Sequence, residues 1–359
     1  MFYKTMIRGL LAAALVASAV TAKADVFHMT GEQTSLETVW VGDTNNLNDS
    51  TGYGAVGYGF VMGKYEVTNA QYAQFLNAKL PNISDAKAGT VLTHDTYGLF
   101  NVNMDTQTYG GITYTPGAGS GYKFAAKTGY ENRPVDYVCW YDAVRFANWL
   151  QNGQGTLAST ETGTYTITGG GQNSGTVLIP DAATRASWDN AHKHWVLPSE
   201  NEWYKAAYYQ PAAKGGDTDG YWLYATKSNT VPSNVLSSSG TNNANYFSGG
   251  YTVGAPYYTS NVGAFAGSPS YYGTFDQDGN VFEWNETAVA GTRCYRGGEF
   301  DSSEGGLRAS FRIPDTATGE GTVGFRVANV AVPEPSTLAL LGVGAIGLIG
   351  WAWRKRSTT

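Results

Sequence analysis

The sequence predicts a mixed α+β fold that is rich in loops and poor in regular secondary structure. Glycine supplies 46 of the 359 residues, and only 14% of the residues are charged, against averages of about 7% and about 25%. Helical periodicity is confined to short stretches, and the strand-like runs are shorter still. The 25 tyrosines and 10 tryptophans can pack long loops onto a core while their polar tips reach water.

Three helices are expected in chain order. The first covers residues 69–78 and opens with a capping box of Thr68 and Gln71. The second covers 140–150, where apolar residues recur at helical spacing. The third covers 200–208, behind a capping box of Ser199 and Glu202.

The expected strands include residues 60–62, 135–138, 195–197 and 324–327. Three longer stretches, 81–130, 151–190 and 211–275, contain repeated turn signals without a sustained period. We therefore expect them to be loops.

Composition excludes several classes of protein. The net charge of −6 and the pI near 5.3 provide no electrostatic basis for binding nucleic acid. The aromatic content excludes a disordered tail, and the low charge excludes a charge-rich coiled coil. Two cysteines in a chain of this length do not form a disulfide framework.

Residues 1–24 are typical of a secretory signal peptide. Lys4 and Arg8 give a basic start, residues 10–20 are apolar, and Ala22-Lys23-Ala24 is an A-x-A cleavage pattern. The alternative is a membrane anchor, which is disfavoured because a span needs about 20 apolar residues. We expect cleavage after Ala24, which leaves residues 25–331 to form the folded domain.

The segment 332–359 contains three features in order: Pro333-Glu334-Pro335, an apolar stretch at 338–353, and the basic cluster Arg354-Lys355-Arg356. The apolar stretch is about long enough to span a bilayer, and the basic cluster would stay in the cytoplasm. We therefore expect a transmembrane helix in the inner membrane, with the body of the protein outside the cytoplasm.

This order of features resembles the PEP-CTERM sorting signal of Gram-negative bacteria; the alternative is an ordinary tail anchor. The resemblance implies an exosortase-type sorting peptidase that cleaves near Pro333–Pro335. It also implies a cell-surface or extracellular location after processing, and an association with exopolysaccharide in a biofilm matrix.

The body of the chain contains a series of short motifs in a fixed order over residues 38–329. They are Gly63-Lys64-Tyr65-Glu66-Val67-Thr68-Asn69, Arg133-Pro134-Val135, Leu197-Pro198-Ser199-Glu200, Asp278-Gly279-Asn280-Val281-Phe282-Glu283-Trp284, and Arg296-Gly297-Gly298 with Gly324-Phe325-Arg326-Val327. In this order they resemble the formylglycine-generating enzyme (sulfatase-modifying factor) domain. The resemblance implies a loop-rich fold related to C-type lectins.

The resembled enzyme oxidises protein cysteine to formylglycine with copper(I) held by two cysteines, which follow the Arg-Gly-Gly motif. Here residues 299–308 contain no cysteine; Ser302 stands near the first position and Leu307 near the second. A hydroxyl cannot replace a thiolate at copper(I), so copper is not expected. Cys139 and Cys294 match neither position, and a buried thiol is favoured for each over a disulfide between them.

The resemblance also implies a structural calcium ion at residues 276–284. The ligands would be the side chains of Asp276 and Glu283 and the backbone oxygens of Gly279 and Val281, a mixture that suits calcium. The alternative is a turn with an acidic rim and no ion. A second family site would use Asn245 and the carbonyl of Tyr246; because residues 254–256 supply no carboxylate, we expect this site to be absent or altered.

Other catalytic groups are weakly indicated. His192 and His194 could lie on one side of a strand, but no further ligand stands at a metal-site spacing. Asp301 and Glu304 could form a glycosidase-like carboxylate pair, although two solvated acids are the usual case.

The sequence therefore favours an exported, non-catalytic protein that binds a glycan or a peptide. We expect the ligand pocket around Trp284, Arg296, Ser302 and Arg312, and paired aromatic residues such as Tyr257-Tyr258 could line it or belong to the core. The alternatives are a formylglycine-generating-type oxidoreductase, another enzyme that uses the same pocket, and a structural surface-layer component.

Overall fold

The computed structural model describes residues 36–84, 92, 95–188, 194–319 and 321–330. The predicted signal peptide and the predicted membrane helix lie outside these residues. Within the described part of the chain, no helix has the length and apolar character to cross a bilayer.

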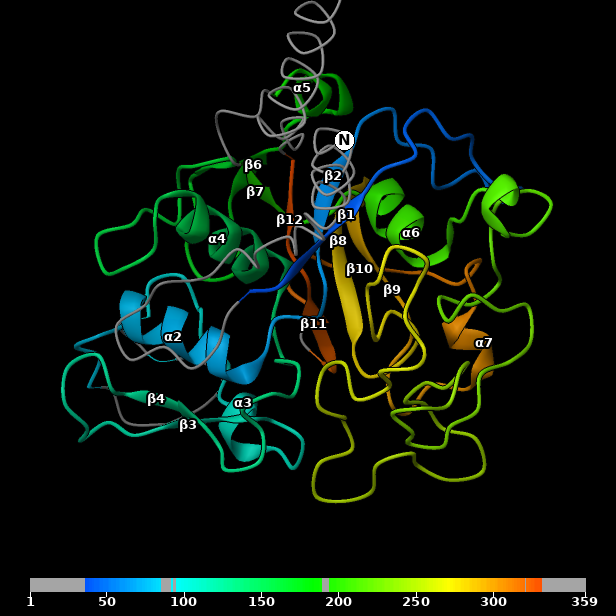
Figure 1. The fold of residues 1–359 in the computed structure, drawn as a ribbon. Coiled ribbons are helices and arrows are strands. Elements are labelled where there is room, and N and C mark those ends of the chain that lie inside the picture. Colours follow the sequence, from blue (N-terminus) through cyan, green and yellow to red (C-terminus); the bar gives the residue numbers. More distant parts are fainter. Residues whose placement is uncertain (1–35, 85–91, 93–94, 189–193, 320, 331–359) are drawn as a thin grey trace, which may run out of the picture.

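Two four-stranded sheets form the centre of the molecule (Figure 1). The first is fully antiparallel, in the order β1 (Thr38–Val41), β2 (Phe60–Gly63), β12 (Ala328–Asn329) and β7 (Trp195–Val196). The second has the order β10 (Ile313–Asp315), β9 (Thr292–Arg296), β8 (Phe282–Val289) and β11 (Val323–Phe325), with β11 parallel to β8. Since only Arg326 and Val327 separate β11 from β12, the end of the domain joins the two sheets.

Helices flank these sheets on two sides (Figure 1). On one side lie α2 (Asn69–Lys79) and α4 (Trp140–Gln151), and on the other lie α6 (Glu200–Tyr208) and the short α7 (Glu304–Leu307). The remaining elements are short: α3 (Asn103–Thr106), α5 (Ala182–Ser187), the 3-10 turn η1 (Ala212–Lys214), and the two hairpins β3 (Ile112–Tyr114) with β4 (Phe124–Ala126) and β5 (Thr166–Thr168) with β6 (Thr176–Leu178).

The predicted capping boxes are confirmed. At α2 the Thr68 hydroxyl accepts from the Gln71 amide at 3.3 Å, and the Gln71 side chain accepts from the Thr68 amide at 2.9 Å. At α6 the Ser199 hydroxyl accepts from the Glu202 amide at 3.2 Å, and Glu202 accepts from the Ser199 amide at 2.7 Å. Each helix therefore starts where these local bonds satisfy its free amides.

An aromatic cluster fixes α2 and α4 to the second sheet. The Phe146 ring on α4 lies 5.3 Å from Phe75 and 6.1 Å from Tyr72 on α2, between ring centroids, and 5.2 Å from Phe325 on β11. Trp149 completes the cluster at 5.2 Å from Phe75. All five rings are buried, so aromatic packing compensates for the shortness of the regular elements.

The predicted fold class, a loop-rich α+β fold, is confirmed, but two strand predictions change. The strand at 135–138 is wrong because Tyr137 has a φ of 58°, which breaks an extended run. The backbone amides of this segment instead donate hydrogen bonds to two different segments. The Val135 amide donates to the carbonyl of Val67, and the Tyr137 amide donates to the carbonyl of Gly321. Of the predicted strand 324–327, Gly324 and Phe325 lie in β11, whereas Arg326 and Val327 form the link that precedes β12.

Candidate functional site

A hollow of about 280 Å³ lies where four separate segments meet. Its lining contains four aromatic rings, two carboxylates and two threonines: Thr108, Tyr109, Tyr251, Tyr258, Glu299, Phe300, Asp301 and Thr322. Tyr251 and Tyr258 come from the long segment between η1 and β8, and residues 299–301 follow β9 directly. We call this hollow the tyrosine pocket.

The acidic side of the tyrosine pocket is shaped by two glycines. Gly297 and Gly298 have φ values of 98° and 77°, and a Cβ on Gly298 would lie 3.2 Å from the carbonyl group of Gly306. Glycine accepts this conformation without steric penalty. The chain therefore turns sharply after β9, which places Glu299 and Asp301 at the pocket.

Hydrogen bonds hold this turn. The Glu299 amide donates to the Ser302 hydroxyl at 3.0 Å, and the Ser302 amide donates to the Glu299 carbonyl at 3.0 Å. The Phe300 amide donates to the carbonyl of Asn280 at 3.0 Å, and the Phe247 amide donates to the carbonyl of Ser302 at 2.9 Å. The last bond attaches the long aromatic loop to the acidic turn.

The aromatic side consists of rings packed edge to face or at a tilt. Phe300 lies 5.3 Å from Tyr109 and 5.5 Å from Tyr258, and Tyr251 lies 4.9 Å from Tyr258, between centroids. Tyr109 stacks in parallel on Tyr137 behind the pocket, at 5.9 Å and 7°. Tyr251 is 43% exposed, and its hydroxyl donates to Asp301 Oδ1 at 3.1 Å. The rings are thus mutually supported before any ligand arrives.

Two carboxylates at this site have buried oxygens without a hydrogen-bond partner among the described residues: one oxygen of Glu299 and both oxygens of Asp136. Burial raises the pKa of Glu299 to about 7, and the charge of Asp301 raises it further in the same direction. Burial also raises the pKa of Asp136 well above its usual range; the charge of Lys127 opposes this rise and that of Glu299 adds to it. Asp136, Glu299 and Asp301 therefore interact electrostatically as a chain of three acids.

The residues predicted to line the ligand pocket lie elsewhere in the fold, apart from Ser302, which closes the acidic turn. Trp284 is fully buried, and its indole donates to the carbonyl of Val138 at 2.8 Å. Arg296 is fully buried as well and pairs with Glu200, its Nε lying 2.8 Å from Oε1. Arg312 reaches the same carboxylate oxygen at 3.1 Å.

Both cysteines are free and buried, as expected. The Cys139 amide donates to Asp142 Oδ2 at the start of α4, at 3.2 Å. Cys294 lies on β9, where its sulfur accepts from Arg312 Nη2 at 2.9 Å. Neither cysteine lines the tyrosine pocket.

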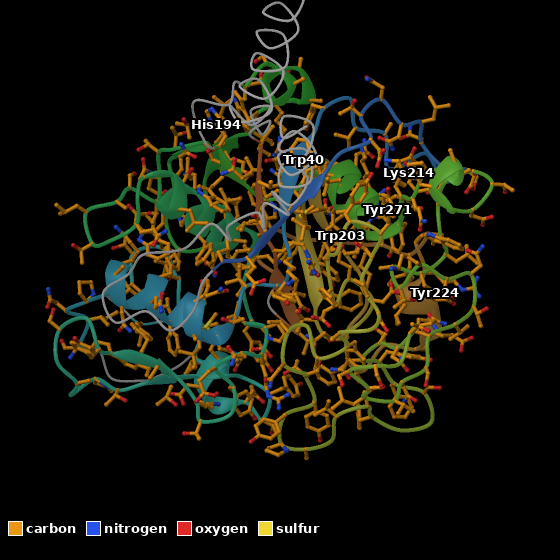
Figure 2. All side chains as sticks on the ribbon, viewed as in Figure 1. Trp40, His194, Trp203, Lys214, Tyr224 and Tyr271 are labelled. Carbon is orange, nitrogen blue, oxygen red and sulfur yellow. The ribbon has the colours of Figure 1, made fainter. Side chains whose placement is uncertain are left out.

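The loop predicted to bind calcium lies in a buried acidic cluster. Glu283 accepts a hydrogen bond from the Trp203 indole at 2.8 Å and another from Arg326. Trp203 lies on α6, in the middle of the molecule (Figure 2). Asp276 is partly buried and accepts from the Gly263 amide at 2.6 Å. Burial and the charges of Asp276 and Glu283 raise the pKa of Glu66 well above its usual range.

Charge balance supports a cation at this loop, although the arrangement is incomplete. Glu66, Asp276 and Glu283 bring three carboxylates to one guanidinium, that of Arg326, and one buried oxygen of Glu66 has no hydrogen-bond partner in the described part of the chain. No three acidic, histidine or cysteine side chains among the described residues form a ready-made metal-binding group. The expected ligand set takes half of its ligands from backbone carbonyls, and of its two carboxylates that of Glu283 already accepts from Trp203 and Arg326.

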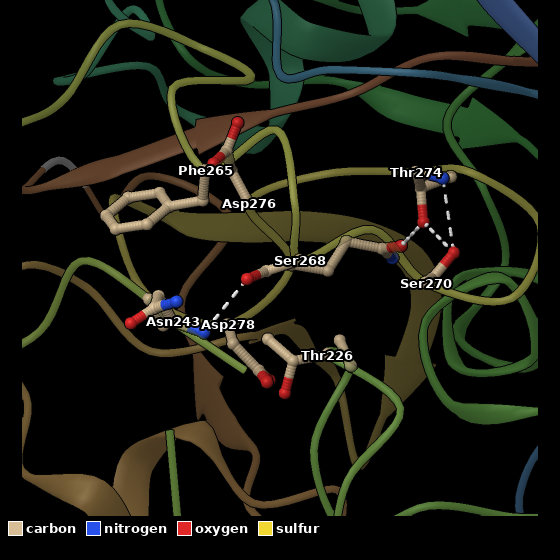
Figure 3. A pocket seen from close by; sticks show the side chains of 11 residues that line it. Thr226, Asn243, Phe265, Ser268, Ser270, Thr274, Asp276 and Asp278 are labelled. Atoms are coloured by element: carbon tan, nitrogen blue, oxygen red, sulfur yellow. Dashed lines mark hydrogen bonds between the residues drawn. The ribbon is translucent and has the colours of Figure 1, made fainter. Parts of the chain in front are cut away.

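A second, much smaller cavity adjoins this loop (Figure 3). It measures about 10 Å³ and includes Asp276 and Asp278 in its lining, so it has room for about one water molecule. Asp278 is 3% exposed, and its carboxyl group points to the same side as the Thr226 hydroxyl. The cavity is too small for an organic ligand.

The remaining candidates are dispersed. Asn245, expected at a second calcium site, is buried and donates to the carbonyl of Tyr258 at 3.0 Å and to Asn280 Oδ1 at 3.1 Å. His194 lies near β6 and β7 (Figure 2) with its ring stacked on Trp188 at 4.1 Å, whereas His192 lies outside the described residues.

Sequence reasoning found part of the tyrosine pocket and missed the rest. Asp301 and Tyr258 were candidates, but Asp301 was paired with Glu304 instead of Glu299. Tyr109 and Tyr251 come from loops without periodicity, so no local signal marks them. The useful signal is the acidic turn itself, Glu299-Phe300-Asp301, which directly precedes Ser302.

Comparison with known proteins agrees with the motifs. Residues 38–331 match the sulfatase-modifying factor enzyme 1-like domain, and residues 331–356 match the PEP-CTERM protein-sorting motif. The latter implies exosortase-dependent sorting and indicates export to the cell envelope. None of the curated proteins is similar enough to count as a match.

Several solved structures are similar over most of the chain. Variable protein 1 of Treponema denticola is 18% identical, with 83% of this chain and 96% of that chain covered and a TM-score of 0.43. CarF is 22% identical, with 82% and 98% covered and a TM-score of 0.48. PvdO from Pseudomonas aeruginosa is 17% identical, with 83% and 96% covered and a TM-score of 0.43. Since the family match extends over most of the chain, the protein belongs to the sulfatase-modifying factor enzyme 1-like family and carries a PEP-CTERM sorting motif.

Proposed function

We propose that this protein binds a glycan outside the cytoplasm and holds one sugar ring in the tyrosine pocket. The observation that supports this most directly is the lining of one open hollow by aromatic rings and carboxylates. Aromatic faces stack on the apolar faces of sugar rings, and carboxylates accept hydrogen bonds from hydroxyl groups. At about 280 Å³ the hollow is slightly smaller than the usual range of ligand pockets, about 300–1,000 Å³, which suits a single ring.

The sorting motif supports the same proposal. A chain that is sorted to the cell envelope meets polysaccharide there. We therefore propose exopolysaccharide as the source of the ligand, and the cell surface or the extracellular matrix as the place where it binds after C-terminal processing.

We propose binding without oxidation. Copper(I) oxidation requires soft thiolate ligands, and neither Cys139 nor Cys294 lines the tyrosine pocket. The alternative, a formylglycine-generating-type oxidoreductase, predicts tight copper(I) binding in a reducing titration together with oxidation of a cysteine peptide. Both results together would replace the glycan proposal.

A structural calcium ion at the loop 276–284 is the second part of the proposal. Asp276 and Glu283, with the carbonyls of Gly279 and Val281, would hold it, and the surplus of buried carboxylates around Arg326 supports it. Calcium would hold the first residues of β8 in place by neutralising the surplus of buried negative charge. It would have no part in ligand binding.

The proposed function is tested with the full chain, purified in a detergent without a sugar headgroup and applied to an array of monosaccharides and bacterial exopolysaccharides. We expect binding that Tyr258→Ala abolishes. Tyr257→Ala is the matched control, because Tyr257 is the adjacent tyrosine but stacks on Arg133 at 3.9 Å and does not line the pocket. Absence of sugar binding, or equal loss in both variants, contradicts the proposal.

A further inference from the structure

We infer that the tyrosine pocket selects a sugar that carries a free ammonium group, that is, an amino sugar without an N-acetyl group. This inference rests on the proposed glycan binding and adds the class of sugar. It follows from the charge on one side of the pocket and the rings on the other.

The pocket concentrates negative charge. Glu299 and Asp301 line it, and the charge of Glu299 also acts on the buried Asp136, which does not line the pocket. Among the described groups, Lys127 is the cation whose charge acts on Asp136, and its ammonium group is already bound to the carbonyls of Gln107 and Gly110. Since the pKa of Glu299 is about 7, this carboxyl group is partly ionised at neutral pH, and an ammonium group would favour its ionised form, whereas a neutral sugar would not.

Buried oxygens of these acids also lack donors. One oxygen of Glu299 and both oxygens of Asp136 have no hydrogen-bond partner among the described residues. Such groups are costly to bury, and proteins retain them where function needs them. An ammonium group brings three N–H donors and a positive charge, so in the pocket it offers both a donor and a countercharge to Glu299; Asp136 is buried and does not line the pocket.

The aromatic side favours the same ligand. The rings of Tyr109, Tyr258 and Phe300 pack around the same hollow. Aromatic faces attract ammonium groups through the negative potential of the ring, and they also stack on the ring of the sugar. An N-acetyl group removes the charge and places a methyl group beside the carboxylates.

Two other cations fit less well. A metal ion prefers six or more hard oxygen ligands, and here four of the eight lining residues present aromatic rings. A lysine side chain carries the same ammonium group, but an open pocket with rings on several sides matches a sugar ring better than an extended alkyl chain. A basic peptide is therefore the competing outcome in the test.

The test is isothermal titration of the full chain at pH 7 with a glucosamine oligosaccharide, its fully N-acetylated counterpart, the matching glucose oligosaccharide and oligolysine. We expect the glucosamine form to bind about tenfold or more tightly than the other sugars, as befits a charge-assisted hydrogen bond. Glu299→Gln should bring the three sugars to similar affinity. Glu304→Gln is the control, because Glu304 is an exposed acid nearby that does not line the pocket.

The outcomes separate the two proposals. Equal binding of all three sugars overturns the amino-sugar inference and leaves glycan binding intact. Binding of none of the sugars overturns glycan binding itself. Tighter binding of oligolysine than of glucosamine replaces the inference with a peptide ligand. Because Glu299→Gln is nearly isosteric, and Asp301→Asn offers a second test of the same charge, misfolding of one variant does not block the experiment.

Discussion

Arg326 and Glu283 form a two-pronged ion pair in the interior, with Nη2 2.5 Å from Oε1 and Nε 2.6 Å from Oε2. Neither side chain is exposed to solvent. Glu283 lies on β8, and Arg326 lies in the two-residue link between β11 and β12. The pair therefore fastens the point where the two sheets join, and loss of one partner would leave the other charge buried and unpaired.

Glu283→Ala tests this pair and the proposed calcium ion together. We expect the free energy of unfolding to fall by about 3–5 kcal/mol, because the Arg326 charge is left buried, and the rise in melting temperature on adding calcium to be lost. Asp276→Asn should also weaken the calcium effect but keep the ion pair, so that its loss of stability without calcium is smaller. A calcium-dependent rise of equal size in both variants and the wild type contradicts the proposed ligands.

Stability should depend on pH through Glu299. Its pKa in the folded protein is about 7, above the ordinary value of 4.5, so between these values the folded state holds a proton that the unfolded state releases. The contribution of Glu299 to the free energy of unfolding is therefore most favourable below pH 4.5, and it is lost as the pH rises towards 7. Glu299→Gln should equal the wild type at pH 4 and be more stable at pH 8 by roughly 1–3 kcal/mol.

Urea unfolding of both proteins at pH 4, 6 and 8 measures this difference. Buried acids that do not interact with Glu299 are present in both chains, so their contributions cancel in the comparison; Asp136, on which the charge of Glu299 acts, adds to the measured difference. A difference that is constant across the pH range shows that Glu299 does not titrate with a raised pKa.

Arg185 should be essential to the fold. It lies buried between two carboxylates, with Nη1 2.7 Å from Glu202 Oε2 and Nη2 bonded to Glu286. Arg185→Leu leaves both acids without their shared cation, so we expect a loss of about 3–5 kcal/mol in unfolding free energy. The loss should be smaller at pH 4, where Glu286, whose pKa is raised by burial, accepts a proton. The control Arg308→Leu removes an exposed arginine; a loss of equal size there contradicts the prediction.

Gly298→Ala should damage the tyrosine pocket through the backbone. The added Cβ would meet the Gly306 carbonyl at 3.2 Å in addition to the strain of a φ of 77°. Gly291→Ala is the matched control, since Gly291 has a φ of 85° and open space around its Cβ position. Both variants should lose about 1–2 kcal/mol from backbone strain, but only Gly298→Ala should also weaken sugar binding. Equal binding by both variants argues against a rigid turn as the basis of the site.

Local signals in the sequence predicted local structure well. Thr68 with Gln71, and Ser199 with Glu202, are close in the chain, so their capping bonds can be foreseen from spacing alone. The backbone conformation of Tyr137 cannot be foreseen in this way, because the Tyr137 ring stacks on Tyr109, which comes from a distant loop. The alternating pattern around it is the same as that of a strand.

The site was harder to predict because its residues meet through long-range contacts. The carboxylate of Glu200 binds Arg296, which lies 96 positions further along the chain, so a motif arginine that resembles a ligand-binding group is buried in an ion pair. Tyr251 reaches Asp301 across 50 positions. The sequence contains these side chains but not the loop path that brings them together, since the segment between η1 and β8 has no periodic pattern.

The attachment of the long loop to the acidic turn by the Phe247–Ser302 bond has an evolutionary consequence. Charge at the pocket is set by a turn fastened to a strand, whereas shape is set by Tyr251 and Tyr258 on a segment that the two sheets do not include. Under the proposed function, exchange of that segment would alter which sugar fits, while the acidic turn would keep its charge. Homologous chains could thus diversify in specificity by rewriting one loop.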